Sequence, residues 1–375
     1  MPGEKILVIA VDGLRAAAVG AYGNTSFPTP ALDQFAADSL IFDWCFADAV
    51  ELPAIYRGLW LPQLSLPRSL AERGYATTLV TDDPALTSWA SAADFHECVQ
   101  LSTVDATRAD DVSQTALARL IGAACEQIEG GAIEHPRFVW VHSRGMYGPW
   151  DAPLELQEPL LAREEGDLLP ADVIDPPEVQ LDDASDPDAA FRWSCAYAAQ
   201  VMALDACFDG LCQTIDASGQ QGKWLVVLCG VRGFPLGEHG CVGGVDGRLF
   251  AEQLHVPLVC RFPDGRDRLA RNAKLVSLAD SSTALLAFAH DGFLLPGRDA
   301  LIAEGPAGKR SIRTADWSLR YDPTAESIES RDNSCCELFV RPDDRWEANN
   351  VASLCSEETA SLLARLSERP ACPTN

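Results

Sequence analysis

The sequence predicts an α/β fold, in which a mostly parallel, doubly wound sheet is flanked by helices and followed by a small C-terminal β-rich subdomain. Three observations support this prediction. Short apolar runs rich in Ile and Val recur along the chain, as is typical of strands buried on both faces. Longer helical patterns separate these runs. After about residue 300, the pattern changes to short alternating segments.

The expected elements alternate along the chain. The predicted strands are 5–11, 77–80, 138–142, 224–229 and 256–262. The predicted helices are 30–39, 64–73, 112–129, 191–215 and 278–289. Thr29 followed by Pro30 marks the start of the first helix, because threonine is a good N-cap and proline is tolerated at the first helical position. Strands that alternate with helices in this way favour a parallel sheet.

We expect residues 1–300 to form the α/β domain and residues 301–375 to form a small subdomain that completes the fold. Within the first part, the segment 151–188 is dense in Asp, Glu and Pro. Such a composition buries little, so this segment is expected to be a surface excursion. In the second part, 310–323 alternates like a β-hairpin, and a last helix is expected over 357–368.

Composition excludes several classes of partner. The 375 residues carry a formal net charge of −26, which argues against nucleic acid and anionic membranes, because binding to phosphate depends on clustered Lys and Arg. No apolar run approaches the ~20 residues that span a bilayer, and no export signal is visible. Most of the 13 cysteines lie in apolar runs. Free thiols in a reducing compartment, and hence a cytoplasmic location, are therefore expected.

Asp12 ends the first predicted strand, and ligands of open α/β sheets bind at the carboxyl ends of strands. The surrounding block, residues 6–49, strongly resembles the N-terminal block of sulfatases in the alkaline phosphatase superfamily, with its pattern VxDDxR, GxYG and TPxLDxLA. The matching residues are Gly20 to Gly23, Thr29 to Asp33, and Phe42. Weaker similarities continue in the same order to "ELFVRPDDRWEANNVA". The resemblance implies a sulfatase-like fold and sulfuric ester hydrolase ancestry.

The resemblance also identifies positions where metal ligands are missing. In sulfatases, an aspartate pair ends the first strand and helps to bind a divalent cation, usually calcium, through oxygen ligands. Here the pair is Asp12 and Gly13. The remaining ligands come from a T-S-D-H/N-G turn, in which Val231 and Arg232 take the ligand positions. Asp12 is thus the one retained ligand, and we expect no calcium or magnesium cofactor.

The nucleophile of the family is also missing. It comes from CxPSR or SxPSR, whose Cys or Ser becomes a formylglycine, and the matching stretch here is "ELPAIYRG". Anchored on Pro53, this alignment places Glu51 at the nucleophile position, and Arg57 replaces the motif arginine with a shifted spacing. His142 and His239 are candidate general bases, although lone histidines at such positions are more often structural.

The loss of the cation raises an electrostatic question at Asp12. A buried carboxylate without a counterion costs several kcal/mol. We hypothesise that the guanidinium of Arg232 occupies the cation position and pairs with Asp12, and with Glu51 as a further partner. The alternative is that Arg232 points into solvent and that the turn has drifted.

A cluster of arginines indicates what a cleft without metal would bind. Arg15, Arg57, Arg144 and Arg232 together would attract a sulfate, phosphate or carboxylate group, because guanidinium groups match such oxyanions. In the alternative interpretation, Arg15 and Arg144 only cap turns. The stretch Thr81 to Asp83 falls where the family has a lysine, and Tyr147 falls where it has a histidine.

We therefore predict a degenerate sulfatase-family protein that has lost metal- and formylglycine-dependent sulfate ester hydrolysis. Its remaining role would be to bind an anionic small molecule, a sulfated or phosphorylated ligand, or a protein partner. One alternative is an active sulfuric or phosphoric ester hydrolase that uses Glu51 and Asp12 in an unfamiliar way. Another is a purely structural or interaction protein.

Overall fold

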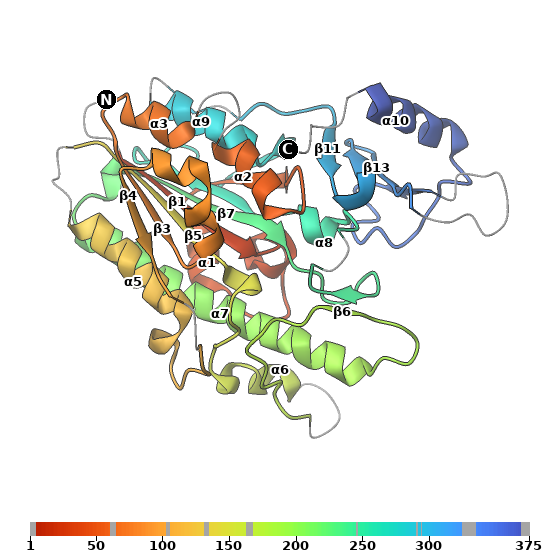
Figure 1. The fold of residues 1–375 in the computed structure, drawn as a ribbon, viewed down its shortest axis with the longest axis horizontal. Coiled ribbons are helices and arrows are strands. Elements are labelled where there is room, and N and C mark those ends of the chain that lie inside the picture. Colours follow the sequence, from red (N-terminus) through yellow and green to blue (C-terminus); the bar gives the residue numbers. More distant parts are fainter. Residues whose placement is uncertain are drawn as a thin grey trace.

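The central feature is an eight-stranded sheet, seen in a computed structural model that describes residues 5–60, 65–102, 106–130, 135–162, 168–244, 247–289, 292–293, 295–324 and 335–368 (Figure 1). The strand order is β10-β2-β9-β7-β1-β5-β3-β4. The strands are β1 (Lys5–Gly13), β2 (Leu40–Phe46), β3 (Ala76–Thr81), β4 (Glu97–Gln100), β5 (Arg137–Ser143), β7 (Trp224–Gly233), β9 (Leu258–Arg261) and β10 (Ala270–Ser277). Only β9 is antiparallel to its neighbours in this sheet. The predicted mostly parallel sheet is confirmed.

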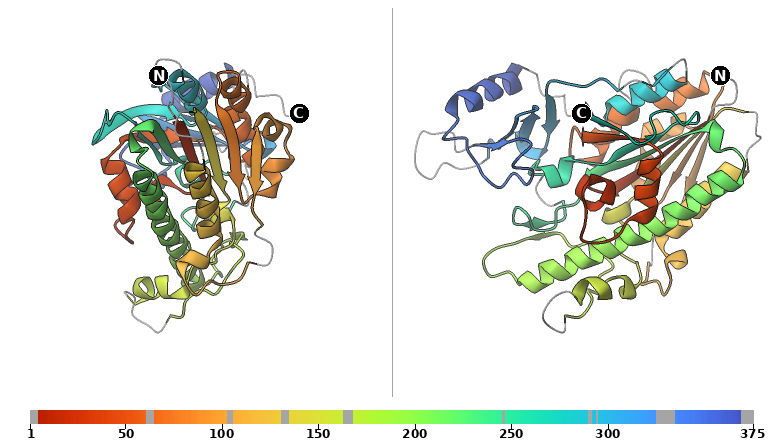
Figure 2. Two further views of the ribbon diagram at one scale, coloured as in Figure 1. Left: turned by 90° about the vertical axis from the view of Figure 1, so that its left-hand side faces the viewer. Right: turned by 180° about the vertical axis from the view of Figure 1, so that it is seen from behind.

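Helices cover both faces of the sheet (Figure 2). Residues of β1 alternate between two hydrophobic clusters, with Ile6 and Val8 in one and Leu7 and Ile9 in the other, as the period of two in a strand requires. The first cluster includes residues of α2 (Leu52–Trp60), α3 (Leu66–Ala71) and α9 (Asp280–Phe288). The second includes residues of α1 (Pro30–Ala37), α5 (Ala116–Glu129) and α7 (Pro187–Ala217). This two-sided burial confirms the doubly wound arrangement.

The sheet brings three strand ends to one edge. β1 pairs in parallel with β5 on one side and β7 on the other. Opposite β7, the register of β1 shifts between Val11 and Gly13, and Gly13 lies opposite Gly233. Because parallel strands end at the same edge, Asp12, the end of β5 and the turn after β7 converge there.

Segment 151–188 packs more closely than its composition suggests. Asp151 is buried, and its Oδ2 accepts a hydrogen bond of 2.7 Å from the backbone N–H of Ala116. Leu160 and Leu161 are the last two residues of α6 (Glu158–Leu161). They form a small hydrophobic cluster with residues of α7. Further along, β6 (Val179–Gln180) pairs with β8 (Cys241–Val242), in the loop after β7. Most of the described residues of this segment are nevertheless exposed or half-buried, and its role as a surface excursion stays a prediction.

The C-terminal part forms a separate antiparallel sheet, drawn in blue in Figure 1. Its strands are β11 (Leu301–Glu304), β12 (Arg310–Arg313), β13 (Trp317–Tyr321) and β14 (Cys336–Val340). The expected hairpin is the β12–β13 pair, and α10 (Ser356–Glu368) shares a hydrophobic cluster with this sheet. The small β-rich C-terminal region is thus confirmed, and its boundary at residue 300 stays a prediction.

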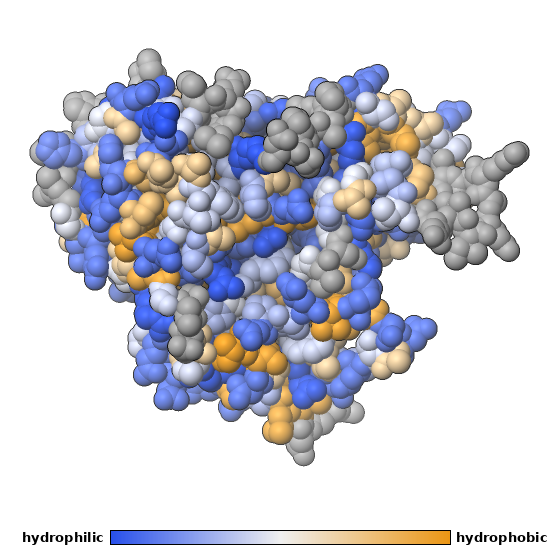
Figure 3. Space-filling view, in the orientation of Figure 1, coloured by the Kyte–Doolittle hydropathy of each residue, from blue (hydrophilic) through white to orange (hydrophobic). Residues whose placement is uncertain are grey.

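The remaining helices are short. They are α4 (Pro84–Ser88) and α8 (Ala251–Leu254). Across the residues described, no helix is both long and apolar enough to cross a bilayer. On the face drawn in Figure 3, apolar residues occur in small separate groups among hydrophilic ones.

Candidate functional site

Asp12 and Arg232 form a two-pronged salt bridge at the sheet edge. Arg232 Nε donates to Asp12 Oδ1 at 2.9 Å, and Arg232 Nη2 donates to Asp12 Oδ2 at 3.0 Å. The third donor, Arg232 Nη1, reaches the backbone carbonyl of Val50 at 2.7 Å. The side chain of Asp12 is only 3% exposed. The contact between Arg232 and Asp12 that we expected from the sequence is therefore present.

Tyr147 completes the surroundings of this guanidinium. The centre of the Tyr147 ring lies 4.1 Å from the Arg232 guanidinium carbon, at cation–π distance. The hydroxyl of Tyr147 donates to the backbone carbonyl of Gly233 at 3.1 Å, which holds the ring in place. Burial alone would lower the pKa of Arg232, but Asp12 and Tyr147 raise it above its ordinary value. Arg232 therefore remains a fixed positive charge between a carboxylate and an aromatic face.

The residues at the family's cation position do not fit a divalent cation. Arg232 engages both carboxylate oxygens of Asp12. Gly13 has φ +77°, and a Cβ built on it would lie 2.6 Å from the Cβ of Met146, so an aspartate does not fit there without a shift. Val231 is fully buried in the hydrophobic cluster that contains Val50. In the described part of the chain, no group of three or more His, Cys, Asp or Glu side chains is arranged to hold a metal.

The residues at the family's nucleophile position lie at the surface. Glu51 is exposed just before α2, and its backbone carbonyl accepts hydrogen bonds from Ala54 and Ile55 in the first turn. The hydrogen bonds of Arg232 go to Asp12 and Val50, so the further pairing with Glu51 that we expected is not among them. Arg57 is exposed one turn further along α2.

The structure brings together three polar side chains, Tyr56, His142 and Asp83, which we did not predict as a group from the sequence. The hydroxyl of Tyr56, on α2, lies 2.5 Å from Nδ1 of His142, at the end of β5. On the other side of the imidazole, Nε2 lies 3.8 Å from Oδ2 of Asp83. Burial raises the pKa of Tyr56, so this phenol stays protonated and shares a hydrogen bond with His142 Nδ1. In the sequence, the position of His142 at a strand end and the stretch Thr81 to Asp83 pointed separately to members of this group, but nothing pointed to Tyr56.

Asp82 contributes a second buried carboxyl group. Its Oδ1 accepts a hydrogen bond of 2.7 Å from the backbone N–H of Arg144. Burial raises the pKa of Asp82 to about 6, in spite of that hydrogen bond. At neutral pH, Asp82 thus adds negative charge in the stretch where the sulfatase resemblance places a lysine.

Comparisons with known proteins identify the family of this chain. The family profile described as Sulfatase matches residues 4–291. The chain belongs to the sulfatase family. No protein of curated function matches the sequence.

Solved structures similar to this sulfatase-family chain support the fold. A proposed sulfatase from Bacteroides fragilis has a TM-score of 0.77 and 16% identity, covering 98% of this chain and 95% of its own. The phosphonate monoester hydrolase of Agrobacterium radiobacter has a TM-score of 0.71 and 17% identity, covering 97% and 94%. A protein solved with its substrate D-glucosamine-2-N,6-O-disulfate has a TM-score of 0.71 and 15% identity, covering 98% and 97%. At these identities, the likeness concerns the fold alone.

The other arginines that we predicted for the site of this sulfatase-family protein contact groups of the protein itself. Arg15 forms an ion pair with Glu238, and its guanidinium lies 5.7 Å from the ring centre of Tyr197. Arg144 Nη2 donates to the backbone carbonyl of Tyr147 at 3.2 Å, within the turn that follows β5. Both contacts agree with a role in shaping turns, and the role of either residue in ligand binding stays a prediction.

His239 lies in a contact between the turn after β7 and the C-terminal part. Its Nδ1 is 2.7 Å from a carboxylate oxygen of Glu252, and its Nε2 is 3.1 Å from the backbone carbonyl of Glu347. The ring stacks on Phe250 with 3.4 Å between centres. Burial acts to lower the pKa of His239, but the hydrogen bond to Glu252 raises it overall. These contacts of His239 are structural, and none of them involves Asp12.

We expect Asp82→Asn to stabilise the protein at pH 7 by about 3 kcal/mol. The carboxyl pKa is about 6 in the folded protein, above the ordinary value of an unfolded aspartate. Folding therefore takes up a proton between about pH 4 and pH 6, and the wild type loses stability as the pH rises through that window. Asparagine keeps the acceptor for the N–H of Arg144 without the charge. Urea unfolding at pH 3.5 and pH 7 measures the difference, and an equal gain at both pH values would contradict this explanation.

Proposed function

We propose that this chain is a sulfatase-family pseudoenzyme, which has lost metal- and formylglycine-dependent sulfate ester hydrolysis and keeps a ligand-binding or partner-binding role. The salt bridge between Arg232 and Asp12 is the main support. A guanidinium that donates to both carboxylate oxygens supplies the positive charge that a calcium or magnesium ion would otherwise supply. It does so without an open coordination position for a substrate oxygen.

The absence of a suitable nucleophile supports the same proposal. Glu51 stands where the family has the cysteine or serine that becomes formylglycine, and a carboxylate cannot form that aldehyde hydrate. Its exposed position before α2 also leaves it outside the hydrogen bonds of Arg232. Asp12 is held by Arg232 and is therefore unavailable as a free base or nucleophile.

The retained role that we propose is binding of an anionic small molecule, sulfated or phosphorylated, in a cytoplasmic protein. The relatives in the fold comparison include a phosphonate monoester hydrolase and a protein with a disulfated sugar substrate, both of which handle anions. Alternatively, the retained role is the binding of a protein partner. An active hydrolase is the second candidate function, favoured by the buried pair of Tyr56 and His142 near Asp83.

Calorimetry on chelator-treated protein tests the proposal. We expect no binding of Ca²⁺ or Mg²⁺ by the wild type, and no release of 4-nitrophenol from its sulfate, phosphate or phenylphosphonate ester with either cation present. Arg232→Asp should gain Ca²⁺ binding, because it adds carboxylate oxygens near Asp12 and the Val50 carbonyl. Arg232→Ala is the matched control, which vacates the same space without adding oxygen ligands.

Two results would overturn the proposal. One is micromolar Ca²⁺ binding by the wild type that Asp12→Asn abolishes. The other is cation-dependent ester hydrolysis that is lost in the same variant. Hydrolysis that is independent of cations and is lost in His142→Gln would instead favour the second candidate function.

A further inference from the structure

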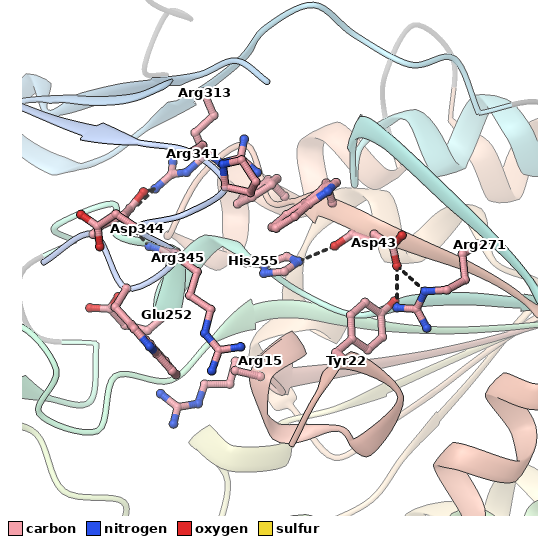
Figure 4. A pocket seen from close by; sticks show the side chains of 17 residues that line it. Arg15, Tyr22, Asp43, Glu252, His255, Arg271, Arg313, Arg341, Asp344 and Arg345 are labelled. Atoms are coloured by element: carbon pink, nitrogen blue, oxygen red, sulfur yellow. Dashed lines mark hydrogen bonds and ion pairs between the residues drawn. The ribbon is translucent and has the colours of Figure 1, made fainter. Parts of the chain in front are cut away.

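A cavity of about 360 Å³ lies between the central sheet and the segment that follows β14 (Figure 4). Its lining includes five arginines, although the chain as a whole carries a net charge of −26. They are Arg15, Arg271, Arg313, Arg341 and Arg345. Neither Asp12 nor Arg232 lines this cavity, so it lies apart from their salt bridge, although Arg15, which we predicted for that site, is part of its lining.

The acidic residues of the lining are already engaged. Asp43 accepts from Nε of Arg271 at 2.8 Å, and Glu347 accepts from Nη2 of Arg313 at 3.0 Å. Glu252 is paired with His239, outside the lining. The carboxylate of Asp344 accepts two backbone N–H groups, from Ala348 at 3.0 Å and Asn349 at 2.9 Å. Each of these four carboxylates therefore has a hydrogen-bond partner other than Arg341 and Arg345, and Arg15 is paired with Glu238, outside the lining.

Two arginines of the lining remain, Arg341 and Arg345. Arg341 is half-buried. Its Nη1 donates to the backbone carbonyl of Thr314 at 2.7 Å. No carboxylate within the described ranges forms an ion pair with it, and burial together with the nearby charge of Arg313 lowers the pKa of Arg341 to about 10. Arg345 is exposed, and its guanidinium lies 4.5 Å from the ring centre of Trp346. Figure 4 shows both arginines entering from the segment after β14.

Flat aromatic rings line the same cavity. His255 stacks on both Trp44 and Phe46, at 5.4 Å and 4.9 Å between ring centres, with interplanar angles of 24° and 22°. Its Nε2 hydrogen-bonds the backbone carbonyl of Asp43 at 2.8 Å. Burial lowers the pKa of His255 to about 4, so the ring is neutral at pH 7. Trp346 is half exposed and adds a further aromatic surface to the lining.

We propose that this cavity binds a small aromatic anion, with its ring against the Trp44 and Trp346 side and its sulfate, phosphate or carboxylate group on Arg341 and Arg345. Guanidinium groups bind such oxyanions strongly where they are partly desolvated. The volume lies at the lower end of ligand pockets, which suits a ligand of one or two rings. This binding does not depend on whether the chain hydrolyses esters.

Binding of 2-naphthyl sulfate, measured by calorimetry and by quenching of tryptophan fluorescence, tests the proposal. Uncharged 2-naphthol serves as the ring without the anion, and inorganic sulfate as the anion without the ring. We expect each of these two probes to bind at least about tenfold more weakly than 2-naphthyl sulfate, because each makes only half of the contacts. Equal binding of 2-naphthol and 2-naphthyl sulfate would overturn the assignment of an anion site.

Single substitutions test whether 2-naphthyl sulfate binds in this cavity. Arg341→Gln and Arg345→Gln should each weaken 2-naphthyl sulfate about tenfold or more, by loss of a charge-assisted contact. Arg345 is exposed, so its variant tests the site even if Arg341→Gln does not fold. Arg266→Gln is the matched control, because Arg266 is also exposed and stacks on an aromatic ring, Phe262, outside the lining. Unchanged binding in Arg345→Gln, or equal weakening in Arg266→Gln, would overturn the proposal.

The same titration separates this proposal from the proposed function. Release of 2-naphthol during the experiment would contradict the loss of hydrolysis without contradicting the cavity. Binding without turnover supports both proposals. Absence of binding overturns the cavity assignment and leaves the salt bridge between Arg232 and Asp12 as the support for the proposed function.

Discussion

Arg232→Met lowers the free energy of unfolding by about 3 kcal/mol, which is the typical cost of breaking a buried ion pair by removing one partner. The side chain of Asp12 is 3% exposed, and both of its oxygens accept from Arg232. Without the guanidinium, the carboxylate is buried without a counterion and the carbonyl of Val50 loses its donor. Methionine keeps much of the side-chain volume, so lost packing contributes little.

A double-mutant cycle checks this explanation. Asp12→Asn/Arg232→Met should recover a large part of the stability, because a neutral amide is far less costly to bury than an unpaired carboxylate. Urea unfolding at pH 7 followed by fluorescence gives the four free energies. A loss below about 1 kcal/mol in Arg232→Met would mean that the pair is solvated and contributes as little as a surface salt bridge.

Glu347→Ala gives the second large effect, a loss of about 3 kcal/mol in the free energy of unfolding. Glu347 and Arg313 are 3% and 2% exposed, and their side chains are 3.0 Å apart. The carboxylate also accepts from Ser318 Oγ at 2.6 Å and from the backbone N–H of Ala251, at the start of α8, at 2.8 Å. One side chain thus connects the C-terminal sheet to the α/β part, and its removal leaves a buried arginine without its counterion.

Hydrogen exchange gives the local measurement for this variant. We expect amides of β12 and β13 to lose more protection than those of β1, because the contact between the two parts is weakened first. Glu337→Ala is a control on the same sheet, since Glu337 pairs with Arg320 but is 42% exposed. Equal loss of stability in both variants would show that burial of Glu347 is not the cause.

Some strands of the sheet can be predicted from the local sequence pattern, and others cannot. β1, β5 and β7 are buried on both faces, so their sequences are continuous apolar runs that can be recognised without a structure. β10 is an edge strand whose first residues alternate between intermediate and exposed positions, and we did not predict it. β2 carries the partly buried Asp43 and Trp44 in its middle, which interrupts an apolar run. A strand with a polar or half-exposed middle has no clear signal of its own.

The sequence by itself determined which oxygen ligands are missing at the ends of β1 and β7, because side-chain identity at a strand end does not depend on packing. It also determined the family resemblance and the parallel sheet, since buried strands leave an apolar pattern. Only the tertiary structure decided that Arg232 pairs with Asp12 and not with Glu51 as well, and that five arginines meet around one cavity. Asp12 and Arg232 are 220 positions apart, and the cavity draws residues from Arg15 to Glu347. The register of β1 against β7 and the packing of the C-terminal sheet bring such distant side chains together, and neither is encoded in any short stretch of the chain.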